Sequence, residues 1–221
     1  MGRRALPKVD PDIDLSRHLK FFDDLPQPWD AARLFNQEAP LEVEVGSGKG
    51  LFLASAAAAQ PQHNFLGIEL AARYAHFAAA RLAKLRLSNA VMIGGDALRV
   101  MREIVPTAGV AAVHVYFPDP WWKKRHRKRR VMNEVLLADV VRVLESGGRL
   151  HFWTDVEEYF QASLELIAAY PTLEGPLAVS ERAAEHTLDY RTHFERRTRL
   201  AGEAVYRAEF VKSPTQDGSA I

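Results

Sequence analysis

The sequence predicts an α/β fold: a doubly wound, mostly parallel sheet of about seven strands with helices on both faces. Strand-like and helix-like segments alternate five times between residues 41 and 170, which is typical of a parallel sheet with helical crossovers. Residues 110–117, VAAVHVYF, are nearly all apolar, as expected for a strand that is buried on both faces. Residues 204–211, AVYRAEFV, alternate instead and predict a late, half-exposed strand.

The elements follow in order along the chain. Residues 41–45, LEVEV, predict a strand that runs into the glycines of 46–50, and an Ala-rich helix follows over 51–60. After a second strand at 64–70, the helix predicted over 71–87 has apolar residues on one face at helical spacing. The other strands are predicted at 90–97, 149–154 and, weakly, 173–179; the other helices are predicted up to residue 105, over 133–144 where SGG stops the helix, over 156–170 and over 182–190.

The chain is predicted to form one main domain, over residues 41–212. Residues 1–40 are predicted to be an N-terminal arm, because prolines interrupt its short apolar clusters, with one short helix near residues 30–36. Residues 213–221 are predicted to be a loose tail. No linker long enough to divide the chain and no internal repeat occurs in the sequence.

The composition excludes several kinds of protein. The net charge of the 221 residues is only +1, so any surface for nucleic acid must be a local patch. The absence of cysteine excludes disulfides and thiolate chemistry. No apolar leader and no apolar run of about 18 residues occurs, so we expect a soluble, cytoplasmic protein.

Acidic residues stand at or just after the ends of the second to fifth predicted strands. Ligands of parallel α/β sheets bind outside the carboxyl ends of the strands, so these positions predict a site. One such acid carries little information, but four in register form a pattern. The four are Glu69, Asp96, Asp119 and Asp155.

The loop GSGKG, residues 46–50, lies between a strand and a helix and allows a ligand to approach the backbone. A purely structural turn is the alternative interpretation. The third glycine of the dinucleotide pattern G-x-G-x-x-G is replaced by Leu51, which disfavours NAD and FAD. The loop does not have the Walker A spacing either.

Three acids near this loop have specific candidate roles. Glu69 can accept hydrogen bonds from ribose hydroxyls or can be a solvated charge at a strand end. Asp96 can accept from an adenine amino group or cap the following helix. Glu44 lies within an apolar strand, where an unpaired carboxylate is costly, so a cationic ligand such as an amino group or a sulfonium would suit it.

Residues 116–130, YFPDPWWKKRHRKRR, place an acid, two tryptophans and a basic run side by side. The run Lys123–Arg130 holds seven Lys or Arg residues and one His. Such a run is usually a solvated face or a targeting signal. Here it begins four residues after Asp119, where it would grip phosphates if the substrate were RNA. Trp121 or Trp122 could stack on a base, although at least one of them is expected in the core.

The sequence resembles known families in these motifs. VEVGSGKG, GIEL and GGDA resemble the class I S-adenosylmethionine-dependent methyltransferases. The 116–130 segment, TDVEEY at 154–159 and THFERR at 192–197 resemble the tRNA (guanine-N7-)-methyltransferase family, which modifies guanine at position 46 in the variable loop. The resemblance covers roughly residues 40–211, and it implies that the last strand is antiparallel.

The resemblance also implies roles for individual residues. Asp119 would be the acid of the catalytic site, and no metal is implied. Arg197 stands where the family usually has glycine, which leaves the local turn after Arg196 open. The cofactor S-adenosylmethionine would be bound by Glu44, Gly46, Gly48, Glu69, Asp96 and Asp119; the substrate by Lys123, Asp155, Thr192, His193, Phe194 and Glu195; and RNA by Arg125, His126, Arg127, Lys128, Arg129 and Arg130. The protein would be a monomer or a homodimer.

The segment Phe117-Pro118-Asp119-Pro120 favours a ring nitrogen as the methyl acceptor. Enzymes that methylate exocyclic amino groups typically have the motif [DN]-P-P-[FY] at this place in the sequence. In this chain an acid displaces the second proline of that motif. Guanine N7 carries an in-plane lone pair and needs positioning rather than a general base. Two alternatives stay open: a small-molecule or protein methyltransferase, which has no use for the basic run, and a non-catalytic RNA-binding module, which has no use for the strand-end acids.

Overall fold

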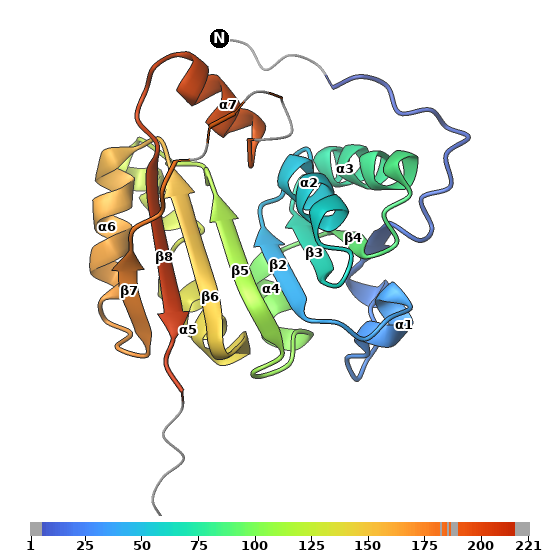
Figure 1. The fold of residues 1–221 in the computed structure, drawn as a ribbon, viewed down its shortest axis with the longest axis horizontal. Helices are drawn as coiled ribbons and strands as arrows, with labels where there is room; N and C mark the ends of the chain where they lie inside the picture. Colours follow the sequence, from blue (N-terminus) through green and yellow to red (C-terminus); the bar gives the residue numbers. More distant parts are fainter. Residues whose placement is uncertain (1–5, 182, 185, 187–189, 215–221) are drawn as a thin grey trace, which may run out of the picture.

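The structure is a computed structural model that describes residues 6–181, 183, 184, 186 and 190–214 (Figure 1). Eight strands form one sheet in the order β1-β4-β3-β2-β5-β6-β8-β7. Their bounds are β1 Leu19–Phe21, β2 Leu41–Val45, β3 Asn64–Glu69, β4 Ala90–Gly94, β5 Val110–Tyr116, β6 Leu144–Thr154, β7 Leu173–Leu177 and β8 Tyr206–Lys212. The helices are α1 Ala31–Phe35, α2 Leu51–Ala59, α3 Ala72–Leu85, α4 Ala97–Glu103, α5 Glu134–Val143, α6 Glu157–Ile167 and α7 His193–Leu200, with 3-10 turns η1 Phe22–Asp24 and η2 Lys124–Arg129.

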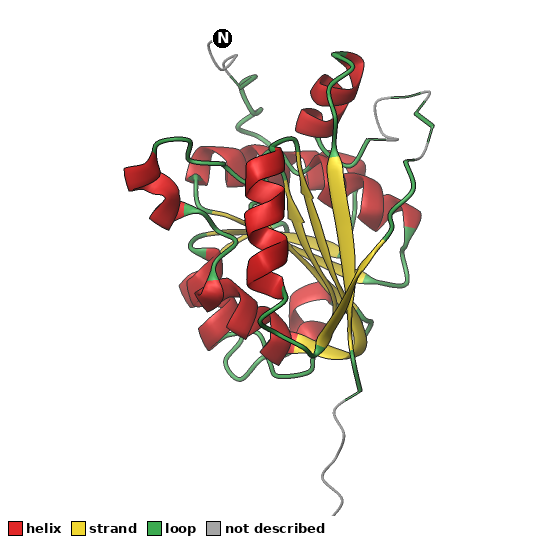
Figure 2. Cartoon of the chain, turned by 90° about the vertical axis from the view of Figure 1, so that its left-hand side faces the viewer, coloured by secondary structure: helices red, strands yellow, loops and turns green. Residues whose placement is uncertain are grey.

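The sheet confirms the predicted fold class. Strands β1 to β6 pair in parallel, and β8 pairs antiparallel with both β6 and β7. Helices lie on both sides of the sheet (Figure 2). The predicted late strand is β8, and its alternating burial follows the alternation of its sequence.

Several elements differ from the sequence prediction; one is β6, which begins at Leu144 and includes the SGG segment, five residues before the predicted start at 149. Within the predicted N-terminal arm, β1 pairs with β4 and extends the sheet by one edge strand. A strand of three residues is too short to show a period, so its pattern is not visible in the sequence. Helix α7 was also not predicted. The helix predicted over 182–190 falls largely outside the described residues, and Ala183, Ala184, His186 and Tyr190 are not helical.

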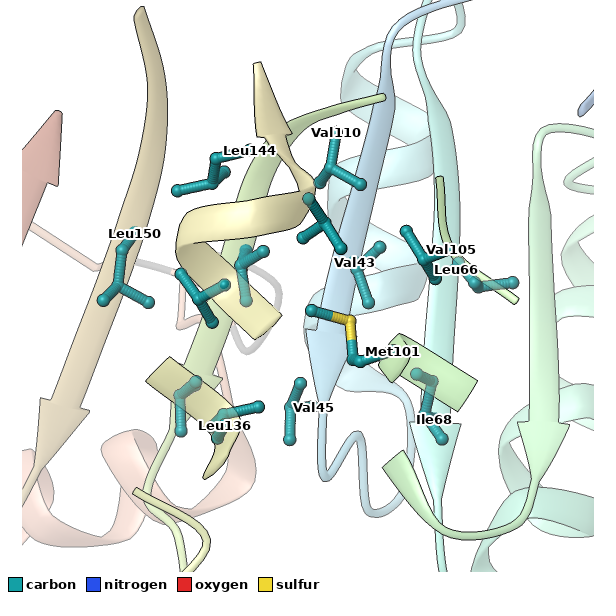
Figure 3. Packing of buried hydrophobic residues seen from close by; sticks show 14 of the residues in the cluster. Val43, Val45, Leu66, Ile68, Met101, Val105, Val110, Leu136, Leu144 and Leu150 are labelled. Carbon is teal, nitrogen blue, oxygen red and sulfur yellow. The ribbon is translucent and has the colours of Figure 1, made fainter. Parts of the chain in front are cut away.

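The two faces of the sheet are covered by different helices, and the acidic side chains of β2 lie on only one of them. One face packs against α1, α4, α5 and α6 through branched and aliphatic residues such as Val43, Ile68 and Met101 (Figure 3). The other face packs against α2 and α3. Because side chains alternate along a strand, Glu42 and Glu44 of β2 lie on this second face, opposite to Val43.

Helix α7 lies above the carboxyl ends of β5 and β6, at the end of the sheet where the parallel strands finish (Figure 1). This end is where the strand-end acids were predicted to gather. Among the described residues, no helix is long and apolar enough to span a membrane.

Candidate active site

The glycine loop between β2 and α2 has a backbone that only glycine adopts without strain. Gly46, Gly48 and Gly50 have φ values of 79°, 54° and 64°. At Gly50 a Cβ would lie 2.7 Å from Cβ of Ala78 on α3, so helix packing also requires glycine. A Cβ at Gly46 or Gly48 would meet nothing within 4 Å, which leaves open space beside the loop for a ligand.

Glu69, at the end of β3, fastens this loop to the start of α3. One carboxylate oxygen accepts from the Gly48 backbone N–H at 2.9 Å, and the other accepts from the Ala71 N–H at 2.8 Å. A carboxylate offers about four lone-pair sites, so capacity for hydroxyl donors remains. The predicted ribose contact stays a prediction, and Glu69 has in addition a structural role that the sequence did not reveal.

Glu44 is a buried carboxyl group with an unsatisfied oxygen. Its residue is 3% exposed, and Oε2 has no hydrogen-bond partner. Burial raises the pKa of Glu44 to about 8, and the nearby negative charge of Glu69 acts in the same direction. The cation of Arg191 opposes the shift. A buried polar atom left unpaired costs free energy, so this oxygen is suited to a cationic or hydrogen-donating ligand.

Asp96 is exposed at the start of α4. Its Oδ1 accepts from the Leu98 backbone N–H at 2.9 Å, so Asp96 is the N-cap of that helix. Of the two roles considered for Asp96 from the sequence, the structure shows the cap of α4. The predicted contact with an adenine amino group remains a prediction.

The segment after β5 is held in a strained conformation. Phe117 and Trp121 have φ values of 49° and 46°, which are costly for residues other than glycine, and such strain is frequent at functional sites. Between them, Pro118 and Pro120 restrict the backbone on either side of Asp119, which is exposed. The Phe117 N–H donates to the Trp153 carbonyl at 2.8 Å, so the segment is anchored to the end of β6.

Arg130 anchors the other end of this segment. Its Nε donates to the Pro120 carbonyl at 2.8 Å, and its two terminal nitrogens contact the Glu158 carboxylate at 2.9 and 3.3 Å. The guanidinium also lies 4.4 Å from the Tyr159 ring centre. Arg130 holds the pKa of Glu158 below its usual range. Arg130 is only 8% exposed, so it is less accessible than the rest of the basic run, and the RNA contact predicted for it remains a prediction.

The rest of the basic run points outward. Residues 124–129 form a 3-10 turn in which all side chains but His126 are exposed, and Lys123, just before it, is exposed too. Trp121 is half-buried, with its ring centre 6.0 Å from that of His126 and 5.2 Å from the guanidinium of Arg129. Trp122 is 68% exposed, so it is the tryptophan available to a base.

The segment from Thr192 to Glu195 begins α7. Thr192 Oγ1 accepts from the Glu195 N–H at 3.0 Å, and Glu195 accepts from the Arg191 N–H at 2.6 Å. Glu195 is buried and also contacts Arg199 and Arg207 at 3.3 and 3.5 Å. Thr192 and Glu195 therefore cap the helix. The helix continues through Arg197 to Leu200, so no turn follows Arg196.

Two residues of α7 face the site. Phe194 is 47% exposed, and its ring stacks on Phe117 with a centroid distance of 6.4 Å. His193 accepts from Arg81 at 3.3 Å, and burial together with Arg81, Lys49 and Arg196 lowers its pKa to about 4. Asp155 is half-buried just after β6. The substrate contacts predicted for these residues remain predictions.

Arg191 lies beside these candidate residues and was not predicted from the sequence. Its guanidinium lies 5.4 Å from the Phe52 ring centre and 5.6 Å from that of Trp153, and it acts electrostatically on Glu44. No sequence signal other than its position beside Thr192 could have indicated this placement. Within the described part of the chain, no cluster of three or more His, Asp or Glu residues could hold a metal ion.

Comparisons with known proteins agree with this architecture. A family model described as "Putative methyltransferase" matches residues 38–208. A tRNA (guanine-N(7)-)-methyltransferase from Rhodopirellula baltica is 49% identical over 96% of this chain and 80% of its own length. The enzyme of that name from Aromatoleum aromaticum is 39% identical over 83% of this chain and 70% of its own length.

Solved structures are similar in fold. The 16S rRNA (adenine(1408)-N(1))-methyltransferase from Catenulisporales acidiphilia has a TM-score of 0.56 at 18% identity, covering 85% of this chain and 92% of that one. An S-adenosylmethionine-dependent O-methyltransferase from Thermotoga maritima has a TM-score of 0.53 at 16% identity, covering 85% and 64%.

The fold is that of a class I S-adenosylmethionine-dependent methyltransferase. Within that class, the chain belongs to the tRNA (guanine-N(7)-)-methyltransferase family. The residues present fit the methyl donor: Gly46 and Gly48 leave open space, and the unsatisfied oxygen of Glu44 can face a cation there.

Proposed function

We propose that the protein transfers a methyl group from S-adenosylmethionine to N7 of guanine in tRNA, at position 46 of the variable loop. One observation carries the choice of reaction. Asp119 is an exposed acid on a strained, proline-bounded segment, and the exposed basic turn 124–129 follows directly. No histidine or lysine needs to act as a base in this arrangement, because the N7 lone pair is already available.

The reaction is a direct displacement. The N7 lone pair forms a bond to the methyl carbon while the carbon–sulfur bond breaks, and the bonding electrons remain on sulfur. The guanine ring becomes positively charged. Asp119 stabilises that charge and accepts from guanine N–H groups, and its fixed backbone means that little reorganisation is needed. Orientation of the two reactants supplies up to ~7–11 kcal/mol.

The remaining site residues divide between the two substrates. Glu44, Gly46, Gly48, Glu69 and Asp96 bind the methyl donor together with Asp119, while Lys123, Asp155 and residues 192–195 bind or position the guanine. The exposed cations of the turn 124–129 grip phosphates. Arg130 acts differently from these, because its contacts with Pro120 and Glu158 fix the loop that carries Asp119.

The test uses methyl-labelled S-adenosylmethionine and an unmodified tRNA transcript, followed by digestion and mapping of the labelled nucleoside. We expect 7-methylguanosine at position 46. A matched transcript with adenosine at position 46 should stay unlabelled. Label on an exocyclic amino group would overturn the reaction, and label on N7 of another guanine would overturn only the position.

A further inference from the structure

We propose that Lys49, Arg81, Arg196 and Arg197 form a second phosphate-binding surface for the RNA substrate, here called the α7 cationic cluster. The inference rests on the proposed function and extends it, because it adds a contact region that lies apart from the basic turn 124–129. The cluster combines residues from the glycine loop, α3 and α7.

The members of the cluster are brought together by α7. Arg81 donates to His193 Nε2 at 3.3 Å, and the guanidinium of Arg197 lies 4.9 Å from the ring centre of Phe194. Arg196 lies three residues after His193 on α7, so the two side chains share one face of the helix, and the positive charges of Arg196 and Lys49 contribute to the low pKa of His193. Arg196 and Arg197 are exposed, whereas Arg81 is partly buried.

Among the described residues, these cations differ from other arginines nearby, which have carboxylate partners. Arg199 and Arg207 of the same region pair with Glu181 at 3.0 Å and with Glu195 at 3.3 and 3.5 Å. In the described part of the chain, no carboxylate lies within 4.0 Å of the four cluster residues. His193 accepts from Arg81 as an uncharged imidazole, so it orients this guanidinium without neutralising it. A phosphate would supply the missing negative charge.

The cluster and the basic turn flank Asp119 on different sides of the sheet. The basic turn adjoins α6, since Arg127 and Arg130 both contact Glu158 there. The cluster adjoins α3, on the opposite face. Phe194 connects the cluster to the reacting position, because its ring stacks on Phe117, two residues before Asp119.

A nucleic-acid strand matches this arrangement. A nucleotide whose base is held at Asp119 has phosphates on both its 5′ and its 3′ side, so its backbone continues in two directions. Cations on both sides of the base can bind the phosphates on its 5′ side and on its 3′ side. Arg197, an exposed cation whose guanidinium lies against the Phe194 ring, adds to the positive charge on the α3 side of this position.

The test measures tRNA affinity as a function of salt concentration. In the test variant Arg81, Arg196 and Arg197 are all changed to Gln. The control variant changes Arg17, Arg33 and Lys84 to Gln, which removes the same charge at exposed positions with no role in the site. Each lost phosphate contact lowers the slope of log K against log salt by ~0.7–0.9, so we expect a decrease of about 2–3 units in the test variant. The control slope should remain within a few tenths of the wild-type value.

Two further measurements make the outcome decisive. Affinity for S-adenosylmethionine, measured by calorimetry, should not change; weaker cofactor binding with an unaltered salt slope would mean that the cluster serves the cofactor, and the inference would fail. Should the triple variant unfold, the single change Arg197→Gln, at an exposed position, should still lower the slope by ~0.7–0.9. Equal slopes for test and control overturn the inference while N7 methylation by the wild type is intact. Absence of N7 methylation by the wild type would instead remove the proposed function itself.

Discussion

The half of the site around the glycine loop and the half around Asp119 obtain their geometry in opposite ways. The loop is shaped by three glycines at positive φ and tied by Glu69, so its conformation costs little strain. The segment around Asp119 places Phe117 and Trp121 at positive φ, where strain must be balanced by contacts such as that of Arg130 with Pro120. We infer that the glycine-loop half, the proposed cofactor half, keeps its shape with little strain, whereas the Asp119 half, the proposed RNA half, depends on its anchors.

The comparison predicts that the strongest effect on catalysis comes from one charge in the RNA half. Asp119→Asn keeps the shape and removes only the charge. Turnover of bound tRNA should fall by roughly 10²–10³, the scale of one lost electrostatic stabiliser. Single-turnover kinetics at saturating S-adenosylmethionine measure this directly.

The pH profile of the same reaction provides the control. Because N7 needs no general base, wild-type rates should be nearly flat from about pH 6 to 8.5. A tenfold rise across this window that disappears in Asp119→Asn would indicate proton abstraction. It would also reopen the choice between a ring nitrogen and an exocyclic amine.

The next effect concerns the exposed turn of the RNA half. Replacing Arg125, Arg127 and Arg129 with Ala should weaken tRNA binding and reduce its salt slope by up to about 3 units. Arg130 is left unchanged in this variant because it holds the loop. Cofactor affinity should change little. A wild-type salt slope in the variant would show that the turn does not contact phosphates.

A smaller effect is expected in the cofactor half. Glu69→Ala should weaken S-adenosylmethionine binding by roughly 1.5–3 kcal/mol, the range for a hydrogen bond to a charged group. Part of this loss comes from the glycine loop, since the Gly48 N–H loses its acceptor. Calorimetry measures the affinity. Unchanged binding would exclude the ribose role. The Glu69→Gln variant can still accept from one N–H, so its affinity for S-adenosylmethionine should lie between those of the wild type and Glu69→Ala.

The sequence predicted local features of the molecule but not the contacts between segments that are distant in the chain. Contiguous patterns were predicted correctly: the strand LEVEV, the following glycine loop and the apolar β5 all occur where expected. The strand-end acids were predicted because parallel strands end at one edge. Contacts between distant segments could not be predicted. Arg191 beside Glu44, Arg81 with His193, and Arg130 with Glu158 depend on how α3, α6 and α7 pack.

Arg130 could not be distinguished from its neighbours in the sequence. It is the last residue of a uniformly basic run, and nothing in the run separates it from Arg129. The burial of Arg130 depends on contacts with distant residues, the Pro120 carbonyl and Glu158 and Tyr159 of α6. The contacts of Glu195 with Arg199 of α7 and Arg207 of β8 could not be predicted either, and its predicted substrate contact stays a prediction.

The smallest predicted effect concerns Glu44 and the pH dependence of stability in the cofactor half. Burial raises the pKa of this group to about 8, far above its ordinary value of 4.5, so in the folded protein without ligand it stays protonated at neutral pH. As the pH rises, the Glu44 carboxyl group therefore ionises at a lower pH in the unfolded chain than in the folded protein. The free energy of unfolding that Glu44 contributes is therefore fully present below pH 4.5 and is lost as the pH rises towards 8.

The difference between the wild type and Glu44→Gln isolates this group. The pKa values of His18, His114, His151 and His193 are all lowered by burial, and their effects on stability are the same in both proteins and cancel in the difference. Between pH 6.5 and 8 the wild type should lose up to about 2 kcal/mol relative to Glu44→Gln, at about 1.4 kcal/mol per pH unit. Urea unfolding at several pH values measures the difference. Saturating S-adenosylmethionine should abolish the decline, because a cation beside Glu44 lowers its pKa. A difference that is constant across the window, or a decline that persists with the ligand bound, would mean that Glu44 is a structural acid and that the cation is held elsewhere.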